Sequence, residues 1–224
     1  MKYLTVVSLL MMSFLGLNAQ ATIELITTDK YSEIREDILE LTQTDDPKKI
    51  LLAFDIDETL LVVEDCLPEG ESAGFLGWLK MARTCPANLT EDVVDDYLIE
   101  FQELGFPTLA LTARADNLLA ATERELARNN LNFLGEPFNA TADFEHPFTK
   151  RSKVVFKNGV TYSASKNKGE VLKILLERLP KTFTEVVFID DGIKNIRAMT
   201  RVWENDPTVH VRIYHYTKYN EVEK

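Results

Sequence analysis

Two carboxylates that could take part in chemistry, Asp55 and Asp57, stand one residue apart in the stretch LLAFDIDETLL at residues 51–61. The residues before them form a continuous apolar run, which is typical of a strand buried on both faces. An ionised carboxylate at the end of such a strand costs several kcal/mol unless a partner or a metal compensates its charge. The pair therefore predicts that a cation lies beside it.

Three further polar elements follow along the chain. Thr112 closes a second apolar run, Asp190 and Asp191 close a third, and Lys168 stands where a helix should begin. Each element alone occurs by chance in many proteins. Because all of them stand at strand ends or at a helix start, their joint placement predicts one functional site.

Apolar periodicity indicates the elements that would bring these residues together. Apolar runs predict strands at 50–56, 107–113, 185–190 and 209–215. Helical spacing and caps predict helices at 31–43, 116–129, 168–179 and after residue 191. Asn158-Gly159 predicts a β-hairpin over 153–164, before Lys168. This alternation predicts an α/β fold, with a Rossmann-like parallel sheet and helices on both faces. Ligands of such sheets bind at the carboxyl ends of the strands.

The four elements, in this order, resemble the motifs of a known family. FDIDETLL, LTAR, NKG and FIDD look like the four motifs of the haloacid dehalogenase-like (HAD) hydrolase superfamily, over roughly residues 50–200. Within it, the chain is similar to secreted acid phosphatase branches and to an exported bacterial group of unknown function. The resemblance implies that Asp55 is the nucleophile and Asp57 the general acid/base. It also implies that Thr112 binds phosphate.

The same resemblance implies that Lys168 binds phosphate and the nucleophile, and that Asp190 binds magnesium. The chemistry of the residue types agrees, because Asp55 can attack phosphorus and form an aspartyl-phosphate. Asp57 can protonate the leaving oxygen and then take a proton from water. Magnesium prefers oxygen ligands, which Asp55, the backbone carbonyl of Asp57 and Asp190 would supply.

Three neighbouring residues have two interpretations each. Asp191 either binds magnesium through a water or only orders its loop. Asn195, one helical turn further on, either forms a hydrogen bond back to the site or faces solvent. Arg114 either contacts the substrate phosphate or pairs with a carboxylate. Thr59 is expected to order the loop that carries it.

The predicted function is an exported, magnesium-dependent phosphatase that acts on a small phosphorylated substrate. Asp57 favours phosphomonoester hydrolysis over carbon–halogen cleavage, because dehalogenases of the family lack an acid/base at this position. Two alternatives stay open. One is a phosphotransferase that passes the phosphoryl group from Asp55 to an alcohol. The other is a catalytically silent secreted binding protein on the same fold.

Residues 62–105 fit no core pattern and are predicted to form a small helical cap, with helices at 71–83 and 90–104. The core domain would then consist of residues 22–61 and 106–224. Cys66 and Cys85 flank the first cap helix. That helix would be roughly 20 Å long, and an extended segment after Cys66 could run back over most of this length. A disulfide is one interpretation and two unrelated buried thiols are the other.

The N-terminus and the overall charge bound the location and the partners. Lys2, an apolar run over 4–17 and an Ala-Gln-Ala ending are typical of a signal peptide at 1–21, and of a periplasmic or secreted protein. The run is short for a membrane anchor, so no membrane span is expected once the leader is removed. The formal net charge of −11 disfavours nucleic acid as a partner.

Overall fold

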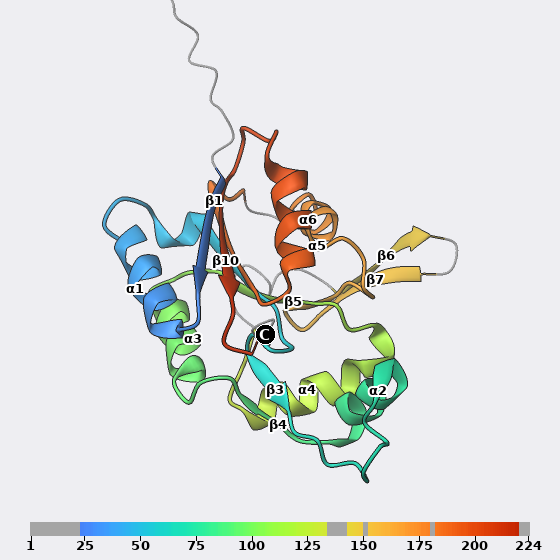
Figure 1. The fold of residues 1–224 in the computed structure, drawn as a ribbon. Helices are drawn as coiled ribbons and strands as arrows, with labels where there is room; N and C mark the ends of the chain where they lie inside the picture. The colour runs from blue at the N-terminus through green and yellow to red at the C-terminus, as the bar shows by residue number, and fades with distance from the viewer. Residues whose placement is uncertain (1–22, 134–142, 150–151, 180–181, 220–224) are drawn as a thin grey trace, which may run out of the picture.

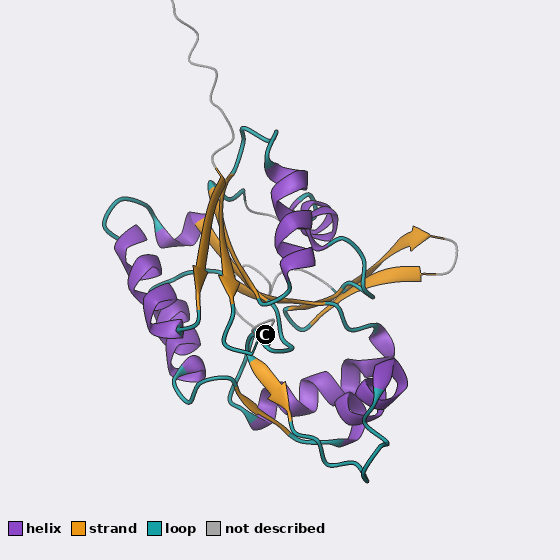
Figure 2. Cartoon of the chain, in the orientation of Figure 1, coloured by secondary structure: helices purple, strands orange, loops and turns teal. Residues whose placement is uncertain are grey.

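An eight-stranded sheet forms the centre of the molecule (Figures 1 and 2). The computed structural model describes residues 23–133, 143–149, 152–179 and 182–219. The strand order is β1-β10-β9-β2-β5-β8-β7-β6. The first six strands in this order are parallel, whereas β7 is antiparallel to both β8 and β6. The strands of this sheet are β1 (Ile23–Thr28), β2 (Ile50–Phe54), β5 (Thr108–Thr112), β6 (Phe144–Thr149), β7 (Ser152–Lys157), β8 (Val160–Tyr162), β9 (Glu185–Asp190) and β10 (His210–Tyr216).

Helices cover both faces of the sheet (Figure 2). The helices of the described residues are α1 (Tyr31–Leu41), α2 (Gly74–Thr84), α3 (Val94–Glu103), α4 (Leu119–Arg128), α5 (Lys168–Leu176) and α6 (Ile193–Trp203), with short 3-10 turns at Pro47–Lys49 and Asp116–Leu118. Of these, α1 and α3 pack on one face of the sheet and α5 and α6 on the other. The pleat of β2 shows how the two cores arise. Leu52 and Phe54 pack with α1 and α3, whereas Leu51 and Ala53 pack with α5 and α6. The predicted α/β fold with a parallel sheet is therefore confirmed.

The hairpin predicted around Asn158-Gly159 is present as β7 and β8. Both turn residues have positive φ, 51° and 76°, as a two-residue primed turn requires. Two strands of this sheet were not predicted. β1 and β6 lie at the two edges of the sheet, where one side of each strand has no neighbour and its sequence need not be continuously apolar.

The segment predicted as a cap divides between two places. β3 (Leu61–Val63) and β4 (Ala87–Leu89) form a separate antiparallel ribbon, and α2 lies between them in sequence. Figure 1 shows this ribbon with α2 and α4 beyond the carboxyl ends of the parallel strands. The second predicted cap helix, α3, packs on the sheet face beside α1 instead. Its stripe of Val94, Leu98 and Phe101 is buried there, and Arg35 of α1 forms two hydrogen bonds with Glu100 at 2.5 and 2.6 Å.

A disulfide joins Cys66 to Cys85, with 5.6 Å between their Cα atoms. It connects the segment after β3 to the end of α2, so it closes a loop around the cap helix. The predicted signal peptide at 1–21 lies outside the described residues. Among the residues that the structure describes, no helix is long and apolar enough to cross a membrane.

Candidate active site

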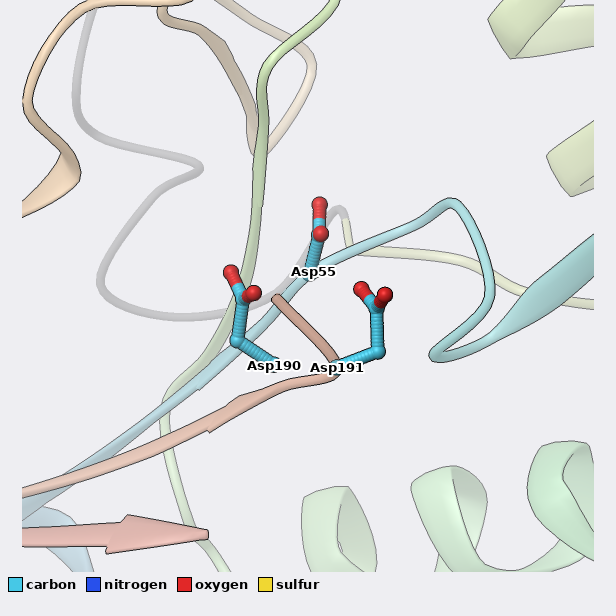
Figure 3. Close-up of side chains that lie close together, drawn as sticks. All are labelled: Asp55, Asp190 and Asp191. Carbon is cyan, nitrogen blue, oxygen red and sulfur yellow. The ribbon is translucent and has the colours of Figure 1, made fainter. Parts of the chain in front are cut away.

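Three carboxylates converge at the carboxyl edge of the sheet (Figure 3). Asp55 follows β2, Asp190 ends the neighbouring strand β9, and Asp191 comes next. One oxygen from each carboxylate lies within 4.8 Å of the other two. Because β2 and β9 are parallel neighbours, their ends lie at the same edge, which is why residues 135 positions apart in sequence meet here.

Lys168 connects two of these carboxylates. Its Nζ lies 2.7 Å from Asp55 Oδ1 and 2.6 Å from Asp190 Oδ2, and its side chain is fully buried. Lys168 begins α5, where the Asn167 side chain accepts a hydrogen bond from Gly169 N at 2.9 Å and caps the helix. A Cβ on Gly169 would lie only 2.9 Å from Val202 Cβ of α6. The glycine therefore lets α5 and α6 approach closely at the helix start that carries Lys168.

The charges of this cluster are not balanced. Burial opposes the charge of Lys168, but Asp190 and Asp55 outweigh it and raise the pKa of the ammonium group. Burial raises the pKa of Asp55, and Lys168 works against this. Burial, with Asp190 and Glu58 adding to it, raises the pKa of Asp191 to about 7. One lysine thus faces three carboxylates, and this excess of negative charge is what a bound cation would neutralise.

The donor set fits a hard divalent cation. The three side chains of the cluster offer only carboxylate oxygens, and these are the ligands that magnesium prefers. Asp57, also predicted to contribute to the metal site, would do so through its backbone carbonyl. Its side chain points to a different partner.

That partner is Arg114, which holds Asp57 by two parallel hydrogen bonds. Arg114 Nε donates to Asp57 Oδ2 at 2.9 Å and its terminal nitrogen donates to Oδ1 at 2.7 Å. Arg114 is 1% exposed, and its other terminal nitrogen donates to Thr122 Oγ1 at 3.0 Å. Of its two interpretations, pairing with a carboxylate is found. The backbone at Glu58 has a φ of 58°, which turns the chain sharply after Asp57.

Thr112 lies at the end of β5, the other neighbour of β2. It is fully buried, and its Oγ1 accepts a hydrogen bond from Arg114 N at 3.1 Å. The structure thus places Asp55, Asp57, Thr112, Lys168, Asp190 and Asp191, the six residues predicted from the sequence, at one edge of the sheet.

Further residues support the loops of the site. Asn195 Nδ2 donates to Asp190 Oδ1 at 3.0 Å, so of its two interpretations the hydrogen bond back to the site is found. Thr59 Oγ1 accepts from Asp191 N at 3.0 Å and connects the loop after β2 to the loop after β9. Two contacts were missed, since no motif marks them. Ser163 Oγ donates to the Thr112 carbonyl at 2.7 Å, and His215 Nε2 lies 2.9 Å from the Asp191 carbonyl.

Comparisons with known proteins place the chain in a family. It matches the family model described as "Protein of unknown function (DUF2608)" over residues 69–224, and it belongs to that family. The match begins after Asp55 and Asp57 and includes the other predicted site residues. A search of curated proteins finds no match to the chain.

Two solved structures are remotely similar to the chain. One is the Class C acid phosphatase from Bacillus anthracis, with 16% identity and a TM-score of 0.46, covering 84% of this chain and 74% of that one. The other is the Class C acid phosphatase from the same organism with tungstate bound, with 14% identity, a TM-score of 0.42 and the same coverage. Neither likeness is close enough to assign a function.

Proposed function

We propose that this chain is an exported, magnesium-dependent phosphatase that hydrolyses small phosphomonoesters through an aspartyl-phosphate on Asp55. The observation that carries the proposal is the position of Lys168, which contacts both Asp55 and Asp190 beside the excess negative charge of the site. A cation in contact with both a nucleophile and a metal ligand is what phosphoryl transfer needs, because this chemistry depends on positioning and charge neutralisation.

In the first step, Asp55 would attack phosphorus and the bond to the leaving oxygen would break. Lys168 would hold the transferred group by charge, and Thr112 would donate its hydroxyl to a phosphoryl oxygen. Asp57 would give a proton to the leaving oxygen. In the second step, Asp57 would take a proton from the water that attacks the aspartyl-phosphate, the bond between phosphorus and the Asp55 oxygen would break, and inorganic phosphate would leave. Magnesium bound by Asp55, Asp190, Asp191 and the Asp57 carbonyl would supply further neutralisation of the phosphoryl charge.

Arg114 has a definite part in this scheme. Both oxygens of Asp57 accept hydrogen bonds from it, which fixes the carboxylate in one orientation. The Asp57 side chain is 23% exposed, so it can still exchange protons with water or substrate. We infer that Arg114 positions Asp57 for its two proton transfers and does not itself bind the substrate phosphate.

Export rests on the leader-like N-terminus, and the Cys66–Cys85 disulfide supports it, because disulfides persist mainly in oxidising compartments. Residues that could serve as acid, nucleophile and cation lie near one another, since Asp57 is close to Asp55 in sequence and Lys168 contacts Asp55. This supports an active enzyme over a silent binding protein. The phosphotransferase alternative uses the same residues and differs only in the acceptor.

The test is hydrolysis of an aryl phosphate by the chain without its leader, with magnesium and with a chelator. We expect metal-dependent turnover, and acid-quenched protein should carry a phosphoryl group on Asp55. Asp55→Asn should abolish turnover, whereas the control Asp92→Asn, at an exposed position, should not change it. A wild type that is inert with magnesium across a broad phosphomonoester panel would contradict the proposal, as would an active Asp55→Asn. Adding an alcohol and measuring its phosphorylation distinguishes the phosphotransferase.

A further inference from the structure

A pocket of about 610 Å³ lies next to the carboxylate cluster, between the start of α5 with the loop before it and the length of α6. Three of its lining residues connect it to the site. Ala113 follows Thr112, Asn167 precedes Lys168, and Asn195 donates a hydrogen bond to Asp190. The pocket therefore lies directly beside the proposed phosphoryl site.

The charge of this pocket is opposite to that of the whole chain. Lys166, Lys194 and Arg201 line it, with Glu170 as its one carboxylate. The chain carries 36 acidic and 25 basic residues, and nearby cations such as Lys173 have an acidic partner. Within the described part of the chain, no carboxylate forms an ion pair with any of the three pocket cations. Three cations without ion-pair partners around one cavity give it a local positive potential that attracts anions.

The dimensions agree with a group that belongs to the same substrate. Lys194 and Arg201 are seven residues apart on α6, which is about 10 Å along a helix axis. Lys194 is adjacent to Asn195 at the wall of the site, and Arg201 lies further away. The cations thus extend outward from the position proposed for the transferred phosphoryl group, over the length of one small sugar or a short alkyl chain.

We infer that this basic pocket binds a second anionic group of the substrate, so that the preferred substrates are phosphomonoesters that carry another phosphate or a carboxylate within about 10 Å. This inference rests on the proposed function and deepens it. A purely solvated surface is the competing explanation, and the experiment below distinguishes the two.

The experiment compares alkanediol bisphosphates of increasing chain length with the monophosphates of the same alkanols. For wild type, we expect kcat/KM to be at least tenfold higher for the bisphosphate at the best chain length. The triple variant Lys166→Ala/Lys194→Ala/Arg201→Ala should lose most of this preference, and each single variant should reduce it about three- to fivefold. Binding of the bisphosphates to Asp55→Asn, measured by calorimetry, gives a readout that does not depend on turnover.

Arg197→Ala is the matched control, because Arg197 is an exposed cation of α6 that does not line the pocket. It should keep the wild-type preference. The inference is overturned if wild type hydrolyses mono- and bisphosphates equally well, or if Arg197→Ala reduces the preference as much as the pocket variants do. Wild type that hydrolyses no phosphate ester would instead refute the proposed function, and if Asp55→Asn then also binds both ester types equally, the pocket fails independently.

Discussion

Removing the charge of Lys168 should destabilise the metal-free protein by an amount that the structure lets us estimate. The Lys168 side chain is 0% exposed, and those of its partners Asp55 and Asp190 are 6% and 0% exposed. Lys168→Met therefore leaves two buried carboxylates without their cation. Breaking a buried ion pair in this way costs about 3–5 kcal/mol. For a chain of this size, 1 kcal/mol corresponds to about 2–4 °C, so the melting temperature should fall by roughly 10 °C.

The loss of stability that Lys168→Met causes should depend on pH in a definite direction. Burial raises the pKa of Asp55, and the loss of Lys168 removes a contact that opposes this rise. In the folded variant, Asp55 therefore keeps its proton at pH values where the unfolded chain has lost it. Because the folded variant then binds more protons than the unfolded chain, its stability falls as the pH rises. We expect the difference in stability between Lys168→Met and wild type to be largest above neutral pH and smaller in acid.

The assay is thermal and urea unfolding in the presence of a chelator, at pH 5 and pH 8. The matched control is Lys173→Met on the same helix, since Lys173 pairs with Asp206 at 2.9 Å but is 34% exposed. An exposed pair contributes at most about 1 kcal/mol. If Lys168→Met is no less stable than Lys173→Met, or if its deficit does not shrink in acid, the account of a buried and poorly compensated charge cluster is wrong.

Three further predictions concern other contacts. Arg114→Lys replaces two parallel hydrogen bonds to Asp57 by one. The kcat for an aryl phosphate should therefore fall about 10- to 100-fold with little change in KM, and steady-state kinetics would measure kcat and KM separately. Cys66→Ser removes a cross-link between residues 19 apart, so the free energy of unfolding should fall by about 3 kcal/mol, as measured in urea, and denatured, unreduced wild type should show no free thiol. Burial raises the pKa of Glu125, but two arginines of its helix and a backbone N–H lower it more, and the net pKa is lowered. The Glu125 carboxylate therefore stabilises the fold at neutral pH, and this stabilisation is lost in acid. The urea midpoint of Glu125→Gln should be lower than that of wild type at pH 7 and equal to it near pH 3.

The positions of the candidate site residues and most of the core strands could be predicted because their signals are local. β2, β5 and β9 are buried on both faces, so their sequences are continuously apolar and stand out in a single pass. The turn at Asn158-Gly159 depends on a backbone conformation that these two residue types favour. Parallel strands also share a carboxyl edge, which is why the sequence alone leads one to expect Asp55, Thr112 and Asp190 together.

The elements at the periphery of the sheet could not be predicted, because their sequences carry no such local signal. β1 and β6 are edge strands with partly exposed residues, so their patterns resemble those of surface segments. The apolar stripe of α3 was visible in the sequence, but a stripe of this kind shows only that a helix buries one face. It does not show whether that face packs on a cap or on the sheet, and the contact of Glu100 with Arg35 connects residues 65 apart.

The sequence by itself therefore determined which residues are candidates for chemistry and at which strand ends or helix starts they stand, because both depend on residue type and short-range periodicity. The tertiary structure alone decided their partners. That Lys168 lies between Asp55 and Asp190, and that Arg114 holds Asp57 with both oxygens, depends on side chains brought together from distant parts of the chain. The basic pocket has the same origin, since its cations come from the loop before α5 and from α6 and meet only because the two helices pack closely at Gly169.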